Sequence, residues 1–395
     1  MAILHRCWQD KLVSAKKHFG HCNLHHFGAV FIPMQSIYDL DTPHLIVDLD
    51  RLERNIAEMA TYMASAGTAL CPHTKTHKSP YVAGLQLAAG ATGITVAKIG
   101  EAEVMADAGF TNIFIANQAV GAIKYQRMLA LNRRLDLTCS VDSPETAHPL
   151  GDAAVLAGEK LQVMIEVDTG LGRAGCRSVT ELIETALAIE STDGLVCAGI
   201  FTHEGHLYGS PADQIIADAA SAAAKMCAMR DALLEKGLPC PKISMGSTPS
   251  AWAVAMQPGV DEVRPGVYVY GDRLQMQRGF PRDNCALTVL TTVVSVRADG
   301  VAILDAGSKS LASDSPFSDK TYGEDLNQPG LVLKGVSEEH GHLRLGNGVQ
   351  VRVGDKLRII PNHACTCVNM HDLFAVCRAD SVEAVLPVAG RGKIQ

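Results

Sequence analysis

The sequence has no uninterrupted apolar run that approaches the ~18 residues of a membrane-spanning helix, so we expect no membrane span. It also has no basic surplus. The net charge is -7, and its lysines and arginines do not gather in one stripe, which argues against a nucleic-acid partner. These absences leave a chain whose hydrophobic share, 47% of 395 residues, is ordinary for a soluble enzyme. We therefore expect a small-molecule substrate.

The 12 cysteines are not spaced like a disulfide framework. They are scattered through apolar segments that resemble strands and helices, without the short, regular spacings of small secreted domains. This distribution predicts free thiols and a cytoplasmic location.

The amino-terminal segment 1–40 is predicted to be a loose extension. Residues 1–33 are basic, with only Asp10 opposing, and lack the apolar stretch of a signal peptide, so a weak organellar transit peptide stays open. An over-long gene start, with Met34 as the true initiator, is another explanation. A zinc site could also be drawn here, but its spacing matches no regular zinc finger; its ligands would be Cys7, Cys22, His25 and His26.

From Thr42 onward, short β-branched runs alternate with helical segments, which is typical of βα units around a parallel sheet. Eight such units predict a closed (β/α)8, TIM-like barrel over residues 41–273. The candidate strands are His44–Leu49, Thr68–Pro72, Ile94–Lys98, Ile113–Asn117, Leu135–Val141, Val163–Val167, Ala198–His203 and Ile243–Gly246.

After about Asp272 the pattern changes to alternating apolar and polar runs separated by turns that contain Gly and Asp. Examples are Leu287–Val296 and Lys356–Ile360. Residues 274–395 are therefore predicted to form an antiparallel β domain. A length of ~150 residues per domain agrees with two domains.

Lys75 follows the second candidate strand, in the run Pro72-His-Thr-Lys-Thr-His-Lys78. The carboxyl ends of barrel strands form the mouth where chemistry occurs, so Lys75 is placed to point into it. A lysine there can form a Schiff base if burial beside cationic or dipolar groups lowers its pKa. A lysine after a strand is more often a solvated loop residue, and this motif alone leaves that explanation open.

A Gly-Ser-Thr turn, Gly246 to Thr248, follows the eighth candidate strand. Free backbone N–H groups and hydroxyls in such a turn suit a phosphate, in the barrel region where phosphates often bind. The following run, Glu262–Gly271, offers further donors near Gly266 and the hydroxyl of Tyr268. Alone, the turn is weak evidence.

Several motifs occur in a fixed order: Asp41-Thr-Pro43, Pro72–Lys78, Glu166–Arg173 with Gly175, Thr202-His203 with Gly205 and Tyr208, Gly246-Ser-Thr248, Arg264–Gly271, Asp305-Ala-Gly307, Glu339-His-Gly341 and Pro361–Cys365. Together they resemble the D-threonine aldolase and D-serine dehydratase family, which has the alanine racemase-like fold (fold type III). The resemblance covers about nine-tenths of the chain, from Leu40 to Gln395.

The resemblance implies a site for pyridoxal 5'-phosphate, with Lys75 carrying the cofactor and a homodimer as the assembly. It also implies roles for the phosphate-binding turn and for Arg173, which would contact the phenolate of the ring. The implied cofactor contacts are Lys75, His73, Arg173, Tyr208, Gly246, Ser247, Thr248, Gly266 and Tyr268. One position departs from the family pattern, which often has Arg where this chain has Cys71.

His363 and Cys365 are two residues apart, so an imidazole and a thiolate can face one side and bind a divalent cation. A buried cysteine beside a structural histidine is the commoner explanation, and Cys367 and His371 keep the ligand set open. The resemblance implies His-x-Asp at these positions in the aldolases and His-x-Cys in the dehydratases. A thiolate favours Zn2+, whereas a carboxylate suits Mg2+ or Mn2+.

These features predict a lyase that uses pyridoxal phosphate and zinc on a β-hydroxy D-amino acid. The preferred reaction is that of a D-serine or D-3-hydroxyaspartate dehydratase, which gives a keto acid and ammonia. The first alternative is a D-threonine or D-3-hydroxyaspartate aldolase, which gives glycine and an aldehyde; the runs Val368–Asp372 and Leu386–Lys393 look more like that branch. An amino-acid racemase is the second alternative, and it needs no metal.

Overall fold

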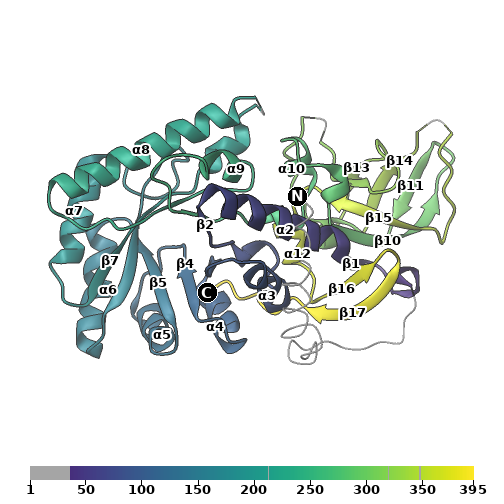
Figure 1. The fold of residues 1–395 in the computed structure, drawn as a ribbon. Coiled ribbons are helices and arrows are strands. Elements are labelled where there is room, and N and C mark those ends of the chain that lie inside the picture. The colour runs from purple at the N-terminus through teal and green to yellow at the C-terminus, as the bar shows by residue number, and fades with distance from the viewer. Residues whose placement is uncertain (1–35, 212, 319, 347) are drawn as a thin grey trace, which may run out of the picture. The chain divides into compact units, whose positions relative to one another are not determined.

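The structure is a computed structural model that describes residues 36–211, 213–318, 320–346 and 348–395 (Figure 1). Contacts divide the described chain into two compact units. The sheet unit contains residues 36–58, 76–89 and 267–392, and the barrel unit contains 59–75, 90–266 and 393–395. The zinc site drawn from Cys7, Cys22, His25 and His26 lies outside the described residues.

The barrel unit is built on eight parallel strands. In sheet order they are β2 (Ala69–Leu70), β9 (Glu262–Val263), β8 (Ile243–Met245), β7 (Leu195–Phe201), β6 (Leu161–Glu166), β5 (Asp136–Val141), β4 (Asn112–Ile115) and β3 (Ile94–Val96). The two end strands are joined by backbone bonds, because the Thr95 N–H donates to the Pro72 carbonyl at 2.9 Å and the Thr92 N–H donates to the Leu70 carbonyl at 2.8 Å. The predicted barrel class is confirmed.

Helices alternate with these strands (Figure 1). They are α4 (Ile99–Asp107), α5 (Ala122–Asn132), α6 (Pro144–Ala157), α7 (Val179–Glu190), α8 (Ile215–Glu235) and the short α9 (Ala251–Val254). Serine caps begin two of them: Ser143 Oγ accepts from the Thr146 N–H, and Ser178 Oγ accepts from the Glu181 N–H. Within the described part of the chain, no helix has the length and apolarity needed to cross a membrane.

The sheet unit contains nine strands: β1 (His44–Asp48), β10 (Leu287–Val296), β11 (Val301–Leu304), β12 (Gly323–Asp325), β13 (Leu333–Val336), β14 (Gly341–Arg344), β15 (Lys356–Pro361), β16 (Leu373–Arg378) and β17 (Ser381–Pro387). Strand order is β13-β14-β11-β10-β1-β16-β17, with β15 pairing β10 and β12. All these pairs are antiparallel except β1 with β16. The predicted antiparallel domain is thus confirmed with one parallel pair.

The remaining helices are short, apart from α2 (Leu49–Ala66), which runs from the sheet unit into the barrel unit. In the sheet unit, α3 (Pro80–Ala88) follows the lysine segment, and α12 (Ala364–Val368) follows β15. The other short helices there are η2 (Ile37–Asp39), η5 (Val267–Val269), α10 (Arg273–Met276), η6 (Arg282–Asn284) and α11 (Ser308–Leu311).

One predicted barrel strand was wrong. The run at His44 forms β1 of the sheet unit, where Leu45 lies opposite Val289 of β10 and Phe374 of β16. The eighth barrel strand is instead β9, whose two residues are too few to show a periodic pattern. An apolar run followed by a helix looks the same in either sheet, because the partner strand is chosen by contacts distant in sequence.

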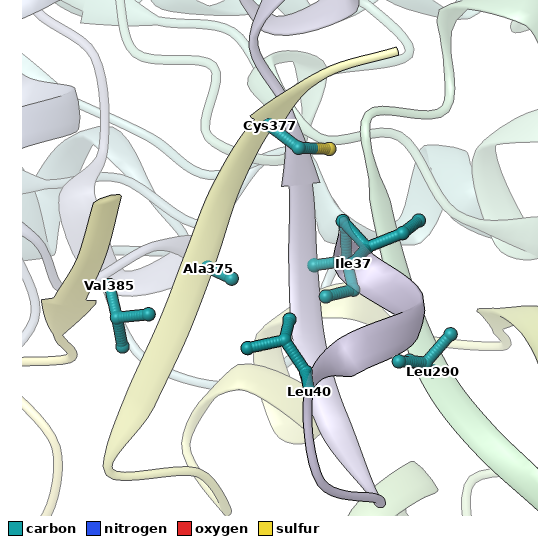
Figure 2. Close-up of a cluster of buried hydrophobic side chains, with 7 residues drawn as sticks. Ile37, Leu40, Leu290, Ala375, Cys377 and Val385 are labelled. Carbon is teal, nitrogen blue, oxygen red and sulfur yellow. The ribbon is translucent and has the colours of Figure 1, made fainter. Parts of the chain in front are cut away.

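A buried apolar cluster ties the first described residues to the sheet unit (Figure 2). Its members come from η2, the segment after it and four strands: Ile37, Leu40, Ile46, Leu290, Ala375, Cys377 and Val385. Burial of one such aliphatic side chain stabilises the fold by roughly 1.5–3 kcal/mol. Residues 36–40 were predicted to be part of a loose extension, and for them that prediction was wrong.

Candidate active site

Lys75 lies in η3 (Thr74–Thr76), the element that follows β2 at the carboxyl end of the barrel strands. Two bonds hold this segment in the barrel unit: the His73 N–H donates to the Pro265 carbonyl at 3.0 Å, and the Thr74 hydroxyl donates to Glu101 Oε1 at 2.6 Å. Glu101 is fully buried. Lys75 itself is half-buried, and its N–H lies 3.4 Å from His73 Nδ1. Its backbone is therefore fixed at the barrel mouth.

Cationic groups surround His203, which follows β7 at the same end of the barrel. Removal from water lowers the pKa of His203 well below its ordinary value, and the positive charges of Lys75 and Arg173 lower it further. The structure thus brings Lys75, Arg173 and His203 into one electrostatic environment. His203 is consequently neutral at pH 7.

Arg173 lies in the loop after β6, and its guanidinium donates to Glu166 Oε1 at 3.3 Å. Glu166 is the last residue of β6, and its other oxygen accepts from Gln118 Nε2 at 2.5 Å. Asp168 shapes the same loop by accepting from the N–H groups of Gly170 and Gly172. The Arg173 side chain remains more than half exposed, so it can still reach a ligand.

The Gly-Ser-Thr turn follows β8 and is buried. Gly246 has φ +103°, and a Cβ at this position would come within 3.1 Å of Val263 Cβ, so the turn requires glycine. The N–H groups of the turn are not all free, contrary to the prediction. The Gly246 N–H donates to Glu204 Oε1 at 2.8 Å, and the Ser247 N–H donates to Ser250 Oγ at 2.9 Å.

Tyr268 lies in the sheet unit with only 2% of its surface exposed. Its hydroxyl accepts from Gln86 Nε2 at 2.9 Å, and Gln86 Oε1 lies 3.2 Å from His77 Nε2. Burial lowers the pKa of His77 to about 4, so this network is uncharged at its histidine. The Tyr268 hydroxyl predicted to help bind phosphate is thus engaged by an amide. Gly266 is buried in the barrel unit, and Tyr208 is half-buried in η4 (Gly205–Gly209).

Two charged residues of the barrel interior were given no role by the sequence analysis. Arg264 follows β9, with its guanidinium bonded to Ser244 Oγ and the Thr202 carbonyl, 5.2 Å from the centre of the Phe201 ring. Glu204 follows His203 and is fully buried, and burial raises its pKa to about 6. A charge inside or directly after a buried strand is the signal that could have drawn attention to both.

His363 and Cys365 lie together at the start of α12, and their side chains are hydrogen-bonded. His363 Nδ1 lies 3.1 Å from Asp314 Oδ2, and Asp272 accepts from the Ala364 N–H at 2.9 Å. Burial opposes a charge on His363, but Cys365 and the two carboxylates outweigh it and raise its pKa to about 9. The half-buried Cys365 Sγ lies 3.2 Å from the hydroxyl of Thr76, the residue after Lys75.

The other two candidate ligands are engaged elsewhere. Cys367 is fully buried, and its thiol donates to the Ser310 carbonyl at 3.1 Å. His371 Nε2 lies 2.9 Å from the same carbonyl, and burial lowers the pKa of His371. Cys71, the position that departs from the family pattern, is also buried, 3.4 Å from the Thr95 hydroxyl. Across the described residues, no group of three or more His, Cys, Asp or Glu side chains could hold a metal.

Two family models match the chain in succession. The alanine racemase N-terminal domain matches residues 47–274, and the serine dehydratase domain matches residues 286–377. The chain belongs to the D-threonine aldolase and D-serine dehydratase family. This confirms the resemblance inferred from the motifs, and the order of the two domains agrees with a barrel followed by a β domain.

Curated members of this family include enzymes of both predicted reactions. The chain is 37% identical over 366 residues to D-threo-3-hydroxyaspartate dehydratase of Delftia sp. (strain HT23), across 87% of this chain and 96% of that protein. It is 32% identical over 366 residues to D-threonine aldolase of Arthrobacter sp., across 91% of this chain and 95% of that protein. Both relatives are lyases, in agreement with the predicted enzyme class.

A solved member of the family adds a structural likeness. It is a D-threo-3-hydroxyaspartate dehydratase in which a cysteine is replaced by alanine, described as a metal-free form. The two structures have a TM-score of 0.84 with 35% identity, and the match covers 90% of this chain and 99% of that one. An alanine racemase of Bacillus anthracis shares only the fold, at a TM-score of 0.66 and 18% identity over 88% of this chain and 98% of that one.

Proposed function

We propose that this lyase is a pyridoxal phosphate- and metal-dependent dehydratase that converts D-3-hydroxyaspartate or D-serine into a keto acid and ammonia. The observation that carries this proposal is the pair His363 and Cys365, with Cys365 3.2 Å from the residue that follows Lys75. The similarity to the Delftia dehydratase supports the same choice of reaction.

The barrel unit fits pyridoxal phosphate in its donor set and its backbone. Lys75 is the candidate for the covalent link, and Arg173 and the half-buried His73 and Tyr208 are the candidates for the ring. Ser247, Thr248 and Gly266 are candidates for the phosphate, beside Gly246, where a side chain would not fit. Tyr268 stays a candidate for the phosphate, because the bond from Gln86 Nε2 uses its oxygen as an acceptor and does not use its O–H as a donor.

The start of α12 fits a soft divalent cation. The Asp314 carboxylate engages His363 Nδ1 and leaves Nε2 as the nitrogen for the metal, an arrangement common among metal-binding histidines. A thiolate ligand favours Zn2+ over Mg2+ and Mn2+. Two protein ligands leave coordination positions for water and for the substrate hydroxyl.

Each group of the proposed site has a separate role in the reaction. Bound pyridoxal phosphate supplies an electron sink for the bond that breaks at Cα. A metal ion at His363 and Cys365 supplies charge withdrawal that eases loss of the β-hydroxyl. Lys75 takes up the Cα proton with its amine. Arg173 and the neutral His203 add hydrogen-bonding groups at the barrel mouth, where Arg173 orients the ring.

The aldolase reaction is the second candidate because the Arthrobacter aldolase covers nearly the same length of this chain. In that reaction the β-hydroxyl is deprotonated rather than expelled, and the bond between Cα and Cβ breaks. The dehydratase and aldolase reactions are distinguished by incubating the full chain with pyridoxal phosphate, Zn2+ and one of three substrates: D-serine, D-threonine or D-3-hydroxyaspartate. We expect ammonia with pyruvate or oxaloacetate; glycine and an aldehyde without ammonia would overturn the dehydratase in favour of the aldolase.

We also propose a homodimer, which the resemblance implies, and a cytoplasmic location, which the scattered cysteines favour. Light scattering of the purified chain measures the first, and fractionation of expressing cells measures the second. A monomer that retains full activity would contradict the proposed assembly.

A further inference from the structure

Glu204 is a buried carboxyl group, and only one of its two oxygens has a hydrogen-bond partner among the described residues. It begins the segment after His203, and none of its surface is exposed. Oε1 accepts a hydrogen bond from the Gly246 N–H at 2.8 Å, and Oε2 has no hydrogen-bond partner among the described residues. A buried polar atom without a hydrogen-bond partner destabilises the fold, so its presence suggests that a ligand or a bound proton supplies the missing partner.

The guanidinium of Arg264 does not donate a hydrogen bond to Glu204 Oε2. The two terminal nitrogens of Arg264 are directed at Ser244 Oγ and at the Thr202 carbonyl. Arg264, in the segment after β9, is the charged side chain that acts on Glu204 and favours its ionised form. Burial opposes this and prevails, raising the pKa of Glu204 to about 6.

The position of Glu204 relative to the turn restricts what its second oxygen can do. Oε1 holds Gly246, the first residue of the turn that the proposed function assigns to the cofactor phosphate. Phosphate oxygens and an ionised carboxylate are both acceptors and repel each other, whereas a protonated carboxyl is a donor to phosphate. A carboxyl at this place therefore has to carry a proton when the phosphate is bound.

We propose that Glu204 is a positioning residue for the phosphate end of the cofactor: Oε1 holds the Gly246 turn, and protonated Oε2 donates a hydrogen bond to the phosphate. This inference rests on the proposed function, because it takes the turn as the phosphate site. The sequence motifs gave Glu204 no role at this turn.

The full chain freed of cofactor tests the proposal with two probes, pyridoxamine 5'-phosphate and pyridoxamine, which differ by the phosphate alone. Loss of a charge-assisted hydrogen bond predicts that Glu204→Ala weakens pyridoxamine 5'-phosphate binding roughly tenfold or more and pyridoxamine binding less than about twofold. Glu204→Gln keeps an acceptor for Gly246 and offers an amide N–H, so it should bind both probes as the wild type does near pH 6.

A matched control lies at the other end of β8, where the carboxylate of Asp261 accepts the Ile243 N–H at 2.7 Å. Asp261→Asn also keeps its backbone bond and loses a charge, and it should leave the affinities for both probes unchanged. Phosphorus NMR of bound pyridoxamine 5'-phosphate adds a local signature. Its resonance should shift in Glu204→Ala and stay at the wild-type position in Glu204→Gln.

The outcomes separate the two claims. Wild-type affinity for pyridoxamine 5'-phosphate in Glu204→Ala, or equal weakening in both Glu204 variants, would overturn the role of Glu204 and leave the proposed function standing. A wild-type chain that binds neither probe would overturn both. If Glu204→Ala does not fold, Glu204→Gln decides: its affinity should stay level between pH 6 and pH 8 while that of the wild type falls, and parallel curves would overturn the proposal.

Discussion

The hydroxyl of Thr76 lies 3.2 Å from the thiol sulfur of Cys365, 289 positions further along the chain. Thr76 directly follows Lys75 in the chain, so this contact inside the sheet unit is made one residue after the lysine that the proposed function assigns to the cofactor. The proposed dehydratase reaction uses both groups on one substrate.

Thr76→Val should therefore weaken zinc binding without removing it. The substitution deletes a hydrogen bond to the sulfur and leaves a side chain of similar shape, so a loss of about 1 kcal/mol, or roughly fivefold in affinity, is expected. Competition with a chromogenic chelator measures the zinc affinity. Thr76→Ser retains the hydroxyl and should bind zinc like the wild type; an equal loss in both variants would point to packing instead.

Cys365→Asp should change the preferred metal. A carboxylate in place of the thiolate favours Mn2+ or Mg2+ over Zn2+, and Cys365→Ala should lose the metal altogether. Metal analysis of the two purified variants measures which metal Cys365→Asp binds and whether Cys365→Ala binds any. Cys367→Ala is the matched control, because that thiol is bonded to the Ser310 carbonyl and should not affect metal content. Unchanged zinc in Cys365→Ala would exclude Cys365 as a ligand.

Borohydride reduction of the holoenzyme should attach pyridoxal phosphate to Lys75. The reduced protein, digested and analysed by mass spectrometry, identifies the labelled residue. Lys78 serves as an internal comparison, since it is buried and its Nζ lies 3.3 Å from the Gly390 carbonyl. Label on Lys78 would show that the lysine was assigned wrongly.

Glu204→Gln should stabilise the chain at neutral pH. Burial raises the pKa of Glu204 from its ordinary value of 4.5 to about 6 in the folded state, so the folded state binds the proton more tightly. Its contribution is full below about pH 4.5 and is lost as the pH rises through 6, by up to roughly 2 kcal/mol. Urea unfolding of cofactor-free protein at pH 5 and pH 8 measures this, and the variant should gain stability over the wild type mainly at pH 8. An identical pH dependence in both proteins would contradict the raised pKa.

Local patterns were sufficient to propose much of the candidate site. Lys75 lies in the segment that follows β2, and strand ends form the mouth of a parallel barrel whatever the other strands are. The two-residue spacing of His363 and Cys365 likewise placed their side chains near each other without knowledge of the fold. Both predictions depended on neighbours in the sequence.

Other features were decided by the tertiary structure alone. The run at His44 joined β10 and β16 because strand pairing is selected by burial against distant segments, which periodicity does not record. For the same reason the turn at Gly246 was predicted with free donors, although Glu204, 42 positions earlier, accepts one of them. The sequence determined which residues are proposed to carry the chemistry, and long-range packing decided which hydrogen-bonding groups remain for a ligand, because most buried donors and acceptors are satisfied by groups that the fold brings beside them.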